Sequence, residues 1–476
     1  MKPWSARALV FGSSAAVLVL EILAGRLMAP YVGISLETFT GIIGTVLAGI
    51  AVGAWAGGAL ADRFDPATLI GPALASGGAL SWLSLPIVGA LGPQLGSGPV
   101  SIVLLTGCAF FLPAAVLTSV SPMAAKLRLG TLEETGSVVG GLSAAGTIGA
   151  LAGTFITGFV LVAAMPTKPI VVLVGAALVG AGAATHWAFQ RSLPTASIVL
   201  VVAACGVLGG LADSPCDHET AYFCVRVEQH GDNPAARDLV LDRLRHAYVN
   251  LEDPTDLDIR YIRLFAQISE SLPDGELDTL HVGGGGFSFP RYLQHVRPGT
   301  RDLVLEIDDE LVGIAEDQLG LVRTDTLQVR TGDARLALDD LGTDSFDLAV
   351  GDAFGSASVP WHLTTREFLA EIDRVLRPGG IYMMNVIDGG DSRFARAELA
   401  TLQEIFPHVV AIMPAGGIPA KAAVNQMLVA SNSPLPELDI DPDDGVLLRG
   451  DDLDAFIDGA RSLRDDFAPV DQLILD

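Results

Sequence analysis

Long apolar runs separated by short charged clusters fill the first 212 residues of the chain. A helix crosses about 30 Å of hydrocarbon with about 20 apolar residues. Seven runs of roughly this length cover residues 8–27, 39–60, 67–91, 100–120, 138–165, 170–189 and 196–211. The pattern predicts a polytopic α-helical domain of seven transmembrane helices over residues 1–212, with the lipid bilayer as its partner.

Basic residues in short loops predict the orientation of these helices, because cytoplasmic loops carry more Lys and Arg. With the amino terminus inside, the outer segments carry only Arg26 and Lys168. The inner segments carry Lys2, Arg7, Arg63, Lys126, Arg128 and Arg191. We therefore expect a cell-membrane protein with a cytoplasmic amino terminus. An odd number of spans then places everything after Leu211 outside the cytoplasm.

Two ionisable residues belong to the first apolar run, where an unpaired charge is costly. Glu21 and Arg26 are interpreted either as a polar site or substrate path in the bundle, or as a structural ion pair. Arg26 alone has a third interpretation, in which its side chain reaches the membrane interface.

Cys216 and Cys224 follow the last apolar run. They fit a disulfide if this segment lies in an oxidising compartment, which agrees with the predicted orientation. The alternative is two unrelated buried thiols in a cytoplasmic domain.

The pattern changes after Thr220 to short alternating stretches, over residues 221–228, 237–242 and 246–251, which predict a small antiparallel β-sheet. Helical spacing follows over residues 257–272, and then strands alternate with helices, which is typical of a doubly wound α/β sheet. The predicted domains after the membrane part are a small β-rich part (213–272), a Rossmann-like domain (273–433) and an acidic tail (434–476).

Glycines and acids follow the predicted parallel strands. The strand 277–282 runs into four glycines, Gly283 to Gly286, and the strand 302–307 carries Glu306 about 20 residues further on. Glycines let a nucleotide approach the backbone closely, and an acid at the end of the next strand binds ribose hydroxyls. We expect a nucleoside site here, although Glu306 alone also fits a surface acid.

Two further strands end in aspartates. Asp333 and Ala334 follow the strand 329–332 in a place suited to contact an adenine edge, although Asp333 also fits a helix cap. Asp352 follows the strand 346–350, where the alternative is a turn aspartate. Asp308 is expected to cap a helix rather than to bind a ligand.

Charge and composition exclude several kinds of partner. The first 212 residues carry 8 Lys and Arg against 6 Asp and Glu, whereas the other 264 carry 21 against 49. This acidic part, without a basic stripe, argues against nucleic-acid binding. The 4 cysteines form no closely spaced Cys or His pairs, so we expect no metal site. A homodimer is left open.

The glycine loop, Glu306, Asp333-Ala334 and Asp352 follow one another along the chain, and this succession of motifs resembles spermidine synthase, the polyamine aminopropyltransferase family, over residues 220–430. The arrangement of an apolar helical domain followed by this domain is similar to the membrane-fused members of the family. The resemblance implies a Rossmann-like fold of the methyltransferase type and decarboxylated S-adenosylmethionine as donor. It implies that Glu306 holds the ribose of the donor and that the glycine loop, with Gly283, Gly284 and Gly285, binds the donor as well. It further implies that Asp333 and Ala334 hold the adenine, and that Asp352 takes a proton from the attacking amine.

The chain departs from the family pattern on the acceptor side. The loop aspartate of the family is replaced by Gly286, and its Asp-Ser-Ser-Asp motif becomes the sequence from Asp352 to Gly355. Its Tyr-His-Glu stretch becomes Tyr261-Ile262-Arg263, and a strand-end Gln corresponds to Asn385. Lost carboxylates and the added Arg263 predict weak diamine binding. The candidates for a rebuilt acceptor pocket, each of which also fits a core position, are His246, Tyr248, Trp361 and His362.

Three functions follow from these observations. The first is a membrane-bound aminopropyltransferase that uses decarboxylated S-adenosylmethionine and a small-molecule acceptor, for instance an amine. The second is an S-adenosylmethionine-dependent methyltransferase that acts on a membrane-associated acceptor. The third is a transporter or sensor whose external domain binds a ligand without turnover, because the donor is made in the cytoplasm.

Overall fold

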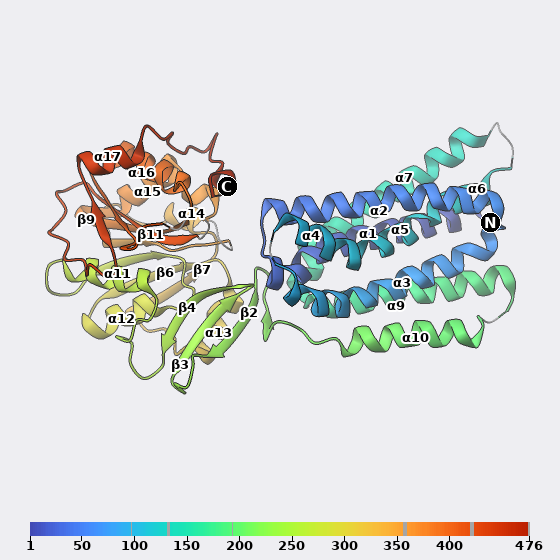
Figure 1. Cartoon of the computed structure of the whole chain (residues 1–476), viewed down its shortest axis with the longest axis horizontal. Helices are drawn as coiled ribbons and strands as arrows, with labels where there is room; N and C mark the ends of the chain where they lie inside the picture. The colour runs from blue at the N-terminus through green and yellow to red at the C-terminus, as the bar shows by residue number, and fades with distance from the viewer. Residues whose placement is uncertain (97, 131–133, 193, 356–358, 419–422, 475–476) are drawn as a thin grey trace. The chain divides into compact units, whose positions relative to one another are not determined.

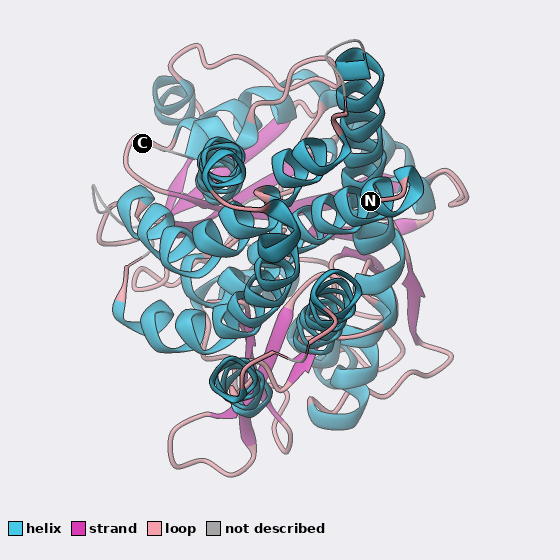
Figure 2. Cartoon of the chain, turned by 90° about the vertical axis from the view of Figure 1, so that its right-hand side faces the viewer, coloured by secondary structure: helices cyan, strands magenta, loops and turns pink. Residues whose placement is uncertain are grey.

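The computed structural model describes residues 1–96, 98–130, 134–192, 194–355, 359–418 and 423–474. The chain forms two compact units, Met1–Val225 and Arg226–Asp476. The first unit contains the apolar runs, and Figure 1 shows its long helices lying side by side. Figure 2 views several of them nearly end-on, as a bundle.

Six helical segments among the described residues are long and apolar enough to cross a membrane, by length and composition. Three are single helices near the amino terminus: α1 (Pro3–Val32), α2 (Leu36–Arg63) and α3 (Pro66–Leu91), the last extended by the turn η1 (Gly92–Gln94). The fourth segment joins α4 (Pro99–Thr106), η2 (Gly107–Phe111), α5 (Leu112–Thr118) and α6 (Val120–Arg128). The fifth joins α7 (Thr135–Ile156), η4 (Thr157–Leu161) and α8 (Val162–Ala164), and the sixth is α9 (Thr167–Gln190).

The seventh predicted span is shorter than the other six. It forms α10 (Ala196–Leu211), whose 16 residues reach only about 24 Å along a helix axis. It packs against α3 through glycines, because a Cβ atom at Gly209 would lie 2.7 Å from the carbonyl oxygen of Trp82. Of the seven predicted spans, six are thus long and apolar enough to cross a membrane, and the seventh is a shorter apolar helix among the described residues.

Arg26 anchors the segment that follows α10. Its guanidinium forms a 3.0 Å ion pair with Glu219, and both side chains are mostly buried. It also donates hydrogen bonds to the backbone carbonyl oxygens of Thr220 and Ala221. The structural ion pair is therefore the interpretation that holds for Arg26, whereas Glu21 lies near the middle of α1.

The second unit is built on an eight-stranded sheet in the order β12-β10-β11-β9-β8-β5-β6-β7. Its parallel strands are β5 (Asp278–Val282), β6 (Arg301–Glu306), β7 (Leu327–Thr331), β8 (Phe346–Gly351) and β9 (Leu376–Asp388). An antiparallel extension comprises β10 (His408–Met413), β11 (Val424–Ser431) and β12 (Val446–Leu448). A small antiparallel sheet comprises β1 (His218–Glu219), β2 (Cys224–Gln229), β3 (Ala236–Leu241) and β4 (Leu244–Asn250).

Helices cover both faces of the large sheet, which explains why its central strands are apolar on both sides (Figure 1). Leu280 and Met384 belong to one core, whereas Val350 and Met383 belong to the other. The helices are α11 (Arg260–Glu270), α12 (Ser288–Val296), α13 (Asp309–Gln318), α14 (Ala334–Leu338), α15 (Arg366–Val375), α16 (Arg393–Ile405), α17 (Asp451–Ile457) and α18 (Val470–Ile474), with the turn η5 (Trp361–Leu363).

The predicted acidic tail is part of this fold. Residues 434–474 supply β12, α17 and α18, whereas 475 and 476 lie outside the described residues. Leu453, Ile457, Leu463 and Val470 are buried in the core that β8 and β9 share with α15 and α16. Leu453 and Ile457 lie one turn apart on α17, so that both face the core although acids surround them in the sequence.

We expect Arg26 and Glu219 to stabilise the first unit jointly. Each alanine substitution should lower the free energy of unfolding, measured by denaturant titration in detergent. The double variant should lose less than the sum, by about 1 to 3 kcal/mol, because the second truncation breaks no further ion pair. Arg63→Ala, at an exposed position, is the control. If the double variant loses the sum of the two single losses in free energy of unfolding, the ion pair between Arg26 and Glu219 does not stabilise the unit.

Candidate active site

The glycine loop lies directly against Asp352. Gly283 follows β5 with a φ angle of 98°, and Gly285 has a φ angle of 49°, both in the region that favours glycine. A Cβ atom at Gly283 would lie 2.4 Å from the carbonyl oxygen of Asp352. The backbone N–H of Asp352 donates to the carbonyl of Val282 at 2.9 Å. The ends of β5 and β8 therefore meet where the loop begins.

The structure explains why an aspartate is missing from this loop. A Cβ atom at Gly286 would lie 2.4 Å from the Cβ of Ala247 on β4, so no larger residue fits. Phe287 is fully buried and its ring contacts Gly284 from below the loop. Ser288 donates to the carbonyl of Tyr248 at 2.6 Å. The small sheet thus holds the glycine loop in place.

Glu306 is buried at the end of β6 and is not a surface acid. One carboxylate oxygen accepts hydrogen bonds from the N–H groups of Gly284 at 2.7 Å and Gly285 at 3.3 Å, and the other accepts from Asp308 at 3.0 Å. Burial raises the pKa of Glu306, and these three backbone donors oppose the rise. The carboxylate is thus joined to the glycine loop.

Asp333 and Ala334 lie beside Glu306 at the same edge, because the N–H of Gly332 donates to the carbonyl of Glu306 at 2.9 Å. One carboxylate oxygen of Asp333 caps α14 by accepting from the N–H of Arg335 at 2.8 Å. The other lies 3.5 Å from Nε2 of His362. Asp333 is therefore a helix cap whose second oxygen faces His362. Asp308 caps α13, as expected.

Asp352 is a partly buried carboxylate surrounded by neutral polar groups. The side-chain amide of Asn385 donates to it at 2.9 Å, and the Tyr261 hydroxyl forms a second hydrogen bond. Burial raises the pKa of Asp352 to about 6, although both hydrogen bonds and the nearby His281 oppose the rise. At neutral pH most of this group is ionised and able to accept a proton.

Asn425 supports this arrangement and was not predicted from the sequence. Its side-chain amide donates to the carbonyl oxygen of Asn385 at 3.0 Å, which orients the Asn385 amide toward Asp352. Asn425 lies on β11, which pairs antiparallel with β9. An asparagine within an apolar strand was the only available signal.

A buried polar cluster beneath the glycine loop was also not predicted. On β5, Nε2 of His281 lies 2.9 Å from both the Thr279 hydroxyl and the Asp302 carboxylate. Gln294 donates to the second Asp302 oxygen at 2.6 Å. Polar side chains at two alternate positions of a buried strand, Thr279 and His281, are the signal that identifies such a cluster.

Arg263 does not enter the acceptor side of the site, contrary to expectation. Its guanidinium binds the carboxylate of Asp444, with an N–O distance of 2.6 Å, and Gln267 donates to the same carboxylate at 2.8 Å. Asp444 is almost fully buried. Arg263 therefore attaches the segment before β12 to α11, and its charge is compensated.

The four candidate acceptor residues separate into two groups. The Tyr248 hydroxyl donates to Asp256 at 2.6 Å, and burial lowers the pKa of His246 to about 4, so this histidine is neutral near pH 7. His362 instead lies beside Asp333, with its Nε2 3.5 Å from a carboxylate oxygen, and its ring packs edge-on against Trp361. The structure therefore places His362 next to an acid of the predicted nucleoside side.

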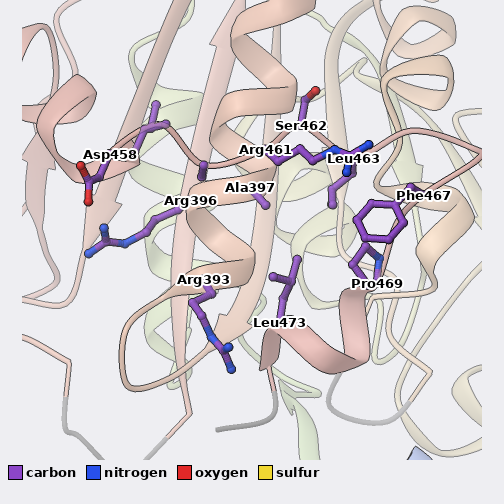
Figure 3. A pocket seen from close by; sticks show the side chains of 12 residues that line it. Arg393, Arg396, Ala397, Asp458, Arg461, Ser462, Leu463, Phe467, Pro469 and Leu473 are labelled. Carbon is purple, nitrogen blue, oxygen red and sulfur yellow. The ribbon is translucent and has the colours of Figure 1, made fainter.

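A separate pocket of about 250 Å³ lies between α16 and the carboxy-terminal segment. Arg393, Arg396 and Arg461 line it together with Phe467 and apolar side chains. Figure 3 shows that the three guanidinium groups point in different directions. The pocket therefore offers no single convergent anion site, and we assign it no role.

The matched family and the curated relatives are transferases. Residues 280–384 match the family described as methyltransferase domain. The chain is 33% identical over 129 residues to a polyamine aminopropyltransferase of Vibrio vulnificus, covering 27% of this chain and 42% of the relative. It is 24% identical over 149 residues to the eEF1A lysine and N-terminal methyltransferase of Xenopus laevis, covering 29% of this chain and 21% of the relative. The chain thus spans less than half the length of either.

A solved structure supports the fold of the second unit. A probable spermidine synthase from Corynebacterium glutamicum superposes with a TM-score of 0.50 at 24% identity, covering 54% of this chain and 99% of that chain. The fold is therefore Rossmann-like, of the methyltransferase and spermidine synthase type. The two curated relatives that the chain matches in part are an aminopropyltransferase and a methyltransferase.

Asp352 should make the stability of the protein pH-dependent. Because the pKa in the folded state is raised to about 6 from 3.8, protonation favours folding. The stabilisation is complete below about pH 4 and is lost as the pH rises through about 6. Asp352→Asn avoids this loss, so its melting temperature relative to wild type should rise between pH 4 and pH 8.

Differential scanning fluorimetry across this pH range checks the prediction. Asp325→Asn, at an exposed position, is the matched control and should show no such trend. A constant difference between Asp352→Asn and wild type would mean that burial does not shift the titration of Asp352.

Proposed function

We propose that this protein is a membrane-bound transferase that uses an adenosylmethionine-type donor. One observation supports the proposal above the others: Gly284, Glu306 and Asp352 meet at one edge of the sheet. Gly283 of the glycine loop lies against the backbone of Asp352, and the N–H of Gly284 donates a hydrogen bond to Glu306. A donor whose ribose hydroxyls form hydrogen bonds with Glu306 would bring its sulfonium group toward Asp352.

The proposed reaction is a displacement at a carbon bonded to the sulfonium of the donor. The acceptor nitrogen forms a bond to this carbon, the carbon–sulfur bond breaks, and its electron pair stays on sulfur as a thioether. The acceptor nitrogen then carries an extra proton, which passes to the carboxylate of Asp352. A carboxylate with a pKa of about 6 suits this role, because it is ionised at neutral pH yet readily protonated.

Neutral groups around Asp352 restrict the acceptor. Its hydrogen-bond partners Asn385 and Tyr261 carry no charge, and Arg263 is engaged by Asp444. One carboxylate stabilises one positive charge, so we propose an acceptor with a single amine near the reacting atom rather than a diamine. Aminopropyl transfer follows from the similarity to polyamine aminopropyltransferases. Methyl transfer is the alternative, supported by the methyltransferase domain match over residues 280–384.

Calorimetry on the full chain in detergent tests this proposal and separates the two reactions. Decarboxylated S-adenosylmethionine should bind more tightly if the aminopropyl group is transferred, and S-adenosylmethionine if the methyl group is. Asp352→Asn should retain donor binding within a few-fold, because the ribose contacts remain. The same variant should lose transfer by about 100-fold or more, because the proton acceptor is gone.

Glu306→Gln provides the complementary variant. It should weaken the binding of either donor, because one carboxylate oxygen becomes an NH2 group, which cannot accept a hydrogen bond from a backbone N–H group or from a ribose hydroxyl. The proposal is wrong if neither donor binds to the wild-type chain. Full transfer activity in Asp352→Asn would remove Asp352 from the mechanism.

A second candidate function is an external ligand-binding domain without turnover. The observation that favours it is the disulfide between Cys216 and Cys224. Disulfides persist in oxidising compartments, whereas adenosylmethionine is made in the cytoplasm. An external second unit would therefore need a ligand other than the cytoplasmic donor.

A topology measurement separates the two candidates. If the second unit is external, a phosphatase fused after Asp476 should be active in intact cells. Cys216 and Cys224 should then resist a maleimide reagent until they are reduced. Activity of a cytoplasmic reporter at the same position, with both cysteines labelled without reduction, would favour the transferase.

A further inference from the structure

A groove of about 700 Å³ lies in the first unit, where α2 packs against α4 and η2 (Figure 1). This volume is within the range of about 300 to 1,000 Å³ that is typical of small-molecule sites. Most of the groove lining is apolar or small, for example Gly41, Gly44, Ala48, Val103, Gly107 and Phe111. No step of the proposed reaction uses this groove.

Missing side chains and a widened helical turn keep the groove open. A Cβ atom at Gly44 or at Gly107 would have open space around it, so neither glycine serves a close helix contact. η2 is a π-helical turn from Gly107 to Phe111, directly before the helix that contains Pro113. Proline has no N–H, and its ring clashes with the carbonyl of the residue four positions earlier, so a wider turn avoids this clash. Such turns inside α-helices are frequent at functional sites.

Glu37 is the one ionisable residue among the described residues that line the groove. It lies in the first turn of α2, just after the loop that joins α1 to α2, and is partly buried. Its carboxylate has no ion-pair partner among the described residues. The helix N-terminus favours this negative charge but supplies no cation. The groove thus has an acid at one end and an apolar body.

Exposed apolar side chains border the groove on both sides. Ile43 and Leu47 of α2 and Leu104 of α4 are exposed. Helices that are apolar on every face are typical of membrane spans, where such side chains contact hydrocarbon. A carboxylate at the end of a span lies at the depth of the lipid headgroups. The occupant that these surroundings favour is therefore an amphiphile with a cationic head.

We propose that the groove binds a lipid whose headgroup carries a primary ammonium, with the ammonium at Glu37 and an acyl chain between α2 and η2. An ammonium group both neutralises the carboxylate and donates hydrogen bonds to it. A headgroup that is only anionic is repelled by Glu37, and a small soluble amine leaves the apolar part of the groove unfilled. This site goes beyond the proposed function and does not depend on it.

Native mass spectrometry of the full chain tests the proposal. The detergent-solubilised protein is given equal amounts of phosphatidylethanolamine, phosphatidylcholine and phosphatidylglycerol with identical acyl chains. Phosphatidylethanolamine should be retained about 5- to 20-fold more than phosphatidylglycerol, the range for one charged hydrogen-bonded contact that is partly exposed. Phosphatidylcholine should lie between them, because its quaternary ammonium keeps the charge but has no N–H to donate.

Glu37→Gln should remove the preference for phosphatidylethanolamine while the total amount of bound lipid stays similar. The matched control is Glu134→Gln, at an exposed position directly before α7, which should keep the preference of wild type. Equal retention of the three lipids by wild type, or an unchanged preference in Glu37→Gln, would overturn the proposal.

Gly44→Leu tests the groove itself, because the added side chain fills it. This variant should lose the selectively retained phosphatidylethanolamine. Gly58→Leu, about four turns further along α2 and also open at its Cβ position, should behave like wild type. Unchanged retention in Gly44→Leu would contradict this location of the lipid. If Gly44→Leu does not fold, Glu37→Gln decides alone, because it leaves the shape of the groove unchanged.

Discussion

The hydrogen bonds from the glycine loop to Glu306 hold the candidate site together. A buried carboxylate is costly unless donors surround it, and here three backbone N–H groups supply the compensation. In return, the carboxylate fixes the conformation of a loop whose glycines adopt positive φ angles. Because this loop contacts Asp352, the same interaction links the positions of Glu306 and Asp352.

The two sides of the site differ in how they depart from the family pattern. On the nucleoside side, the acids expected from the resemblance are present and adjacent. On the acceptor side, two of the departures have a packing reason: Ala247 leaves no room for a side chain at Gly286, and Asp444 binds Arg263. These changes leave Asp352 among neutral hydrogen-bond partners, which is a different environment from one built for a dication.

The sequence predicted the features that are local in the chain. Apolar runs ending in glycine or an acid located the ends of β5, β6 and β8, and with them Gly283, Glu306 and Asp352. Features that depend on distant pairing were not accessible. Arg263 and Asp444 are 181 residues apart, and Asn425 reaches Asn385 only because β11 pairs with β9. Acidic composition likewise concealed the apolar positions that bring residues 434–474 into the core.

Hydrogen–deuterium exchange of the full chain, with and without S-adenosylhomocysteine, tests the central claim most directly. If the nucleoside binds at the edge formed by the glycine loop, Glu306 and Asp333, exchange should slow in peptides covering residues 282–288, 305–309 and 332–336. Peptides covering α17 and the pocket beside it should not change. Protection confined to that pocket or to the apolar helices, with no change at the glycine loop, would contradict the account.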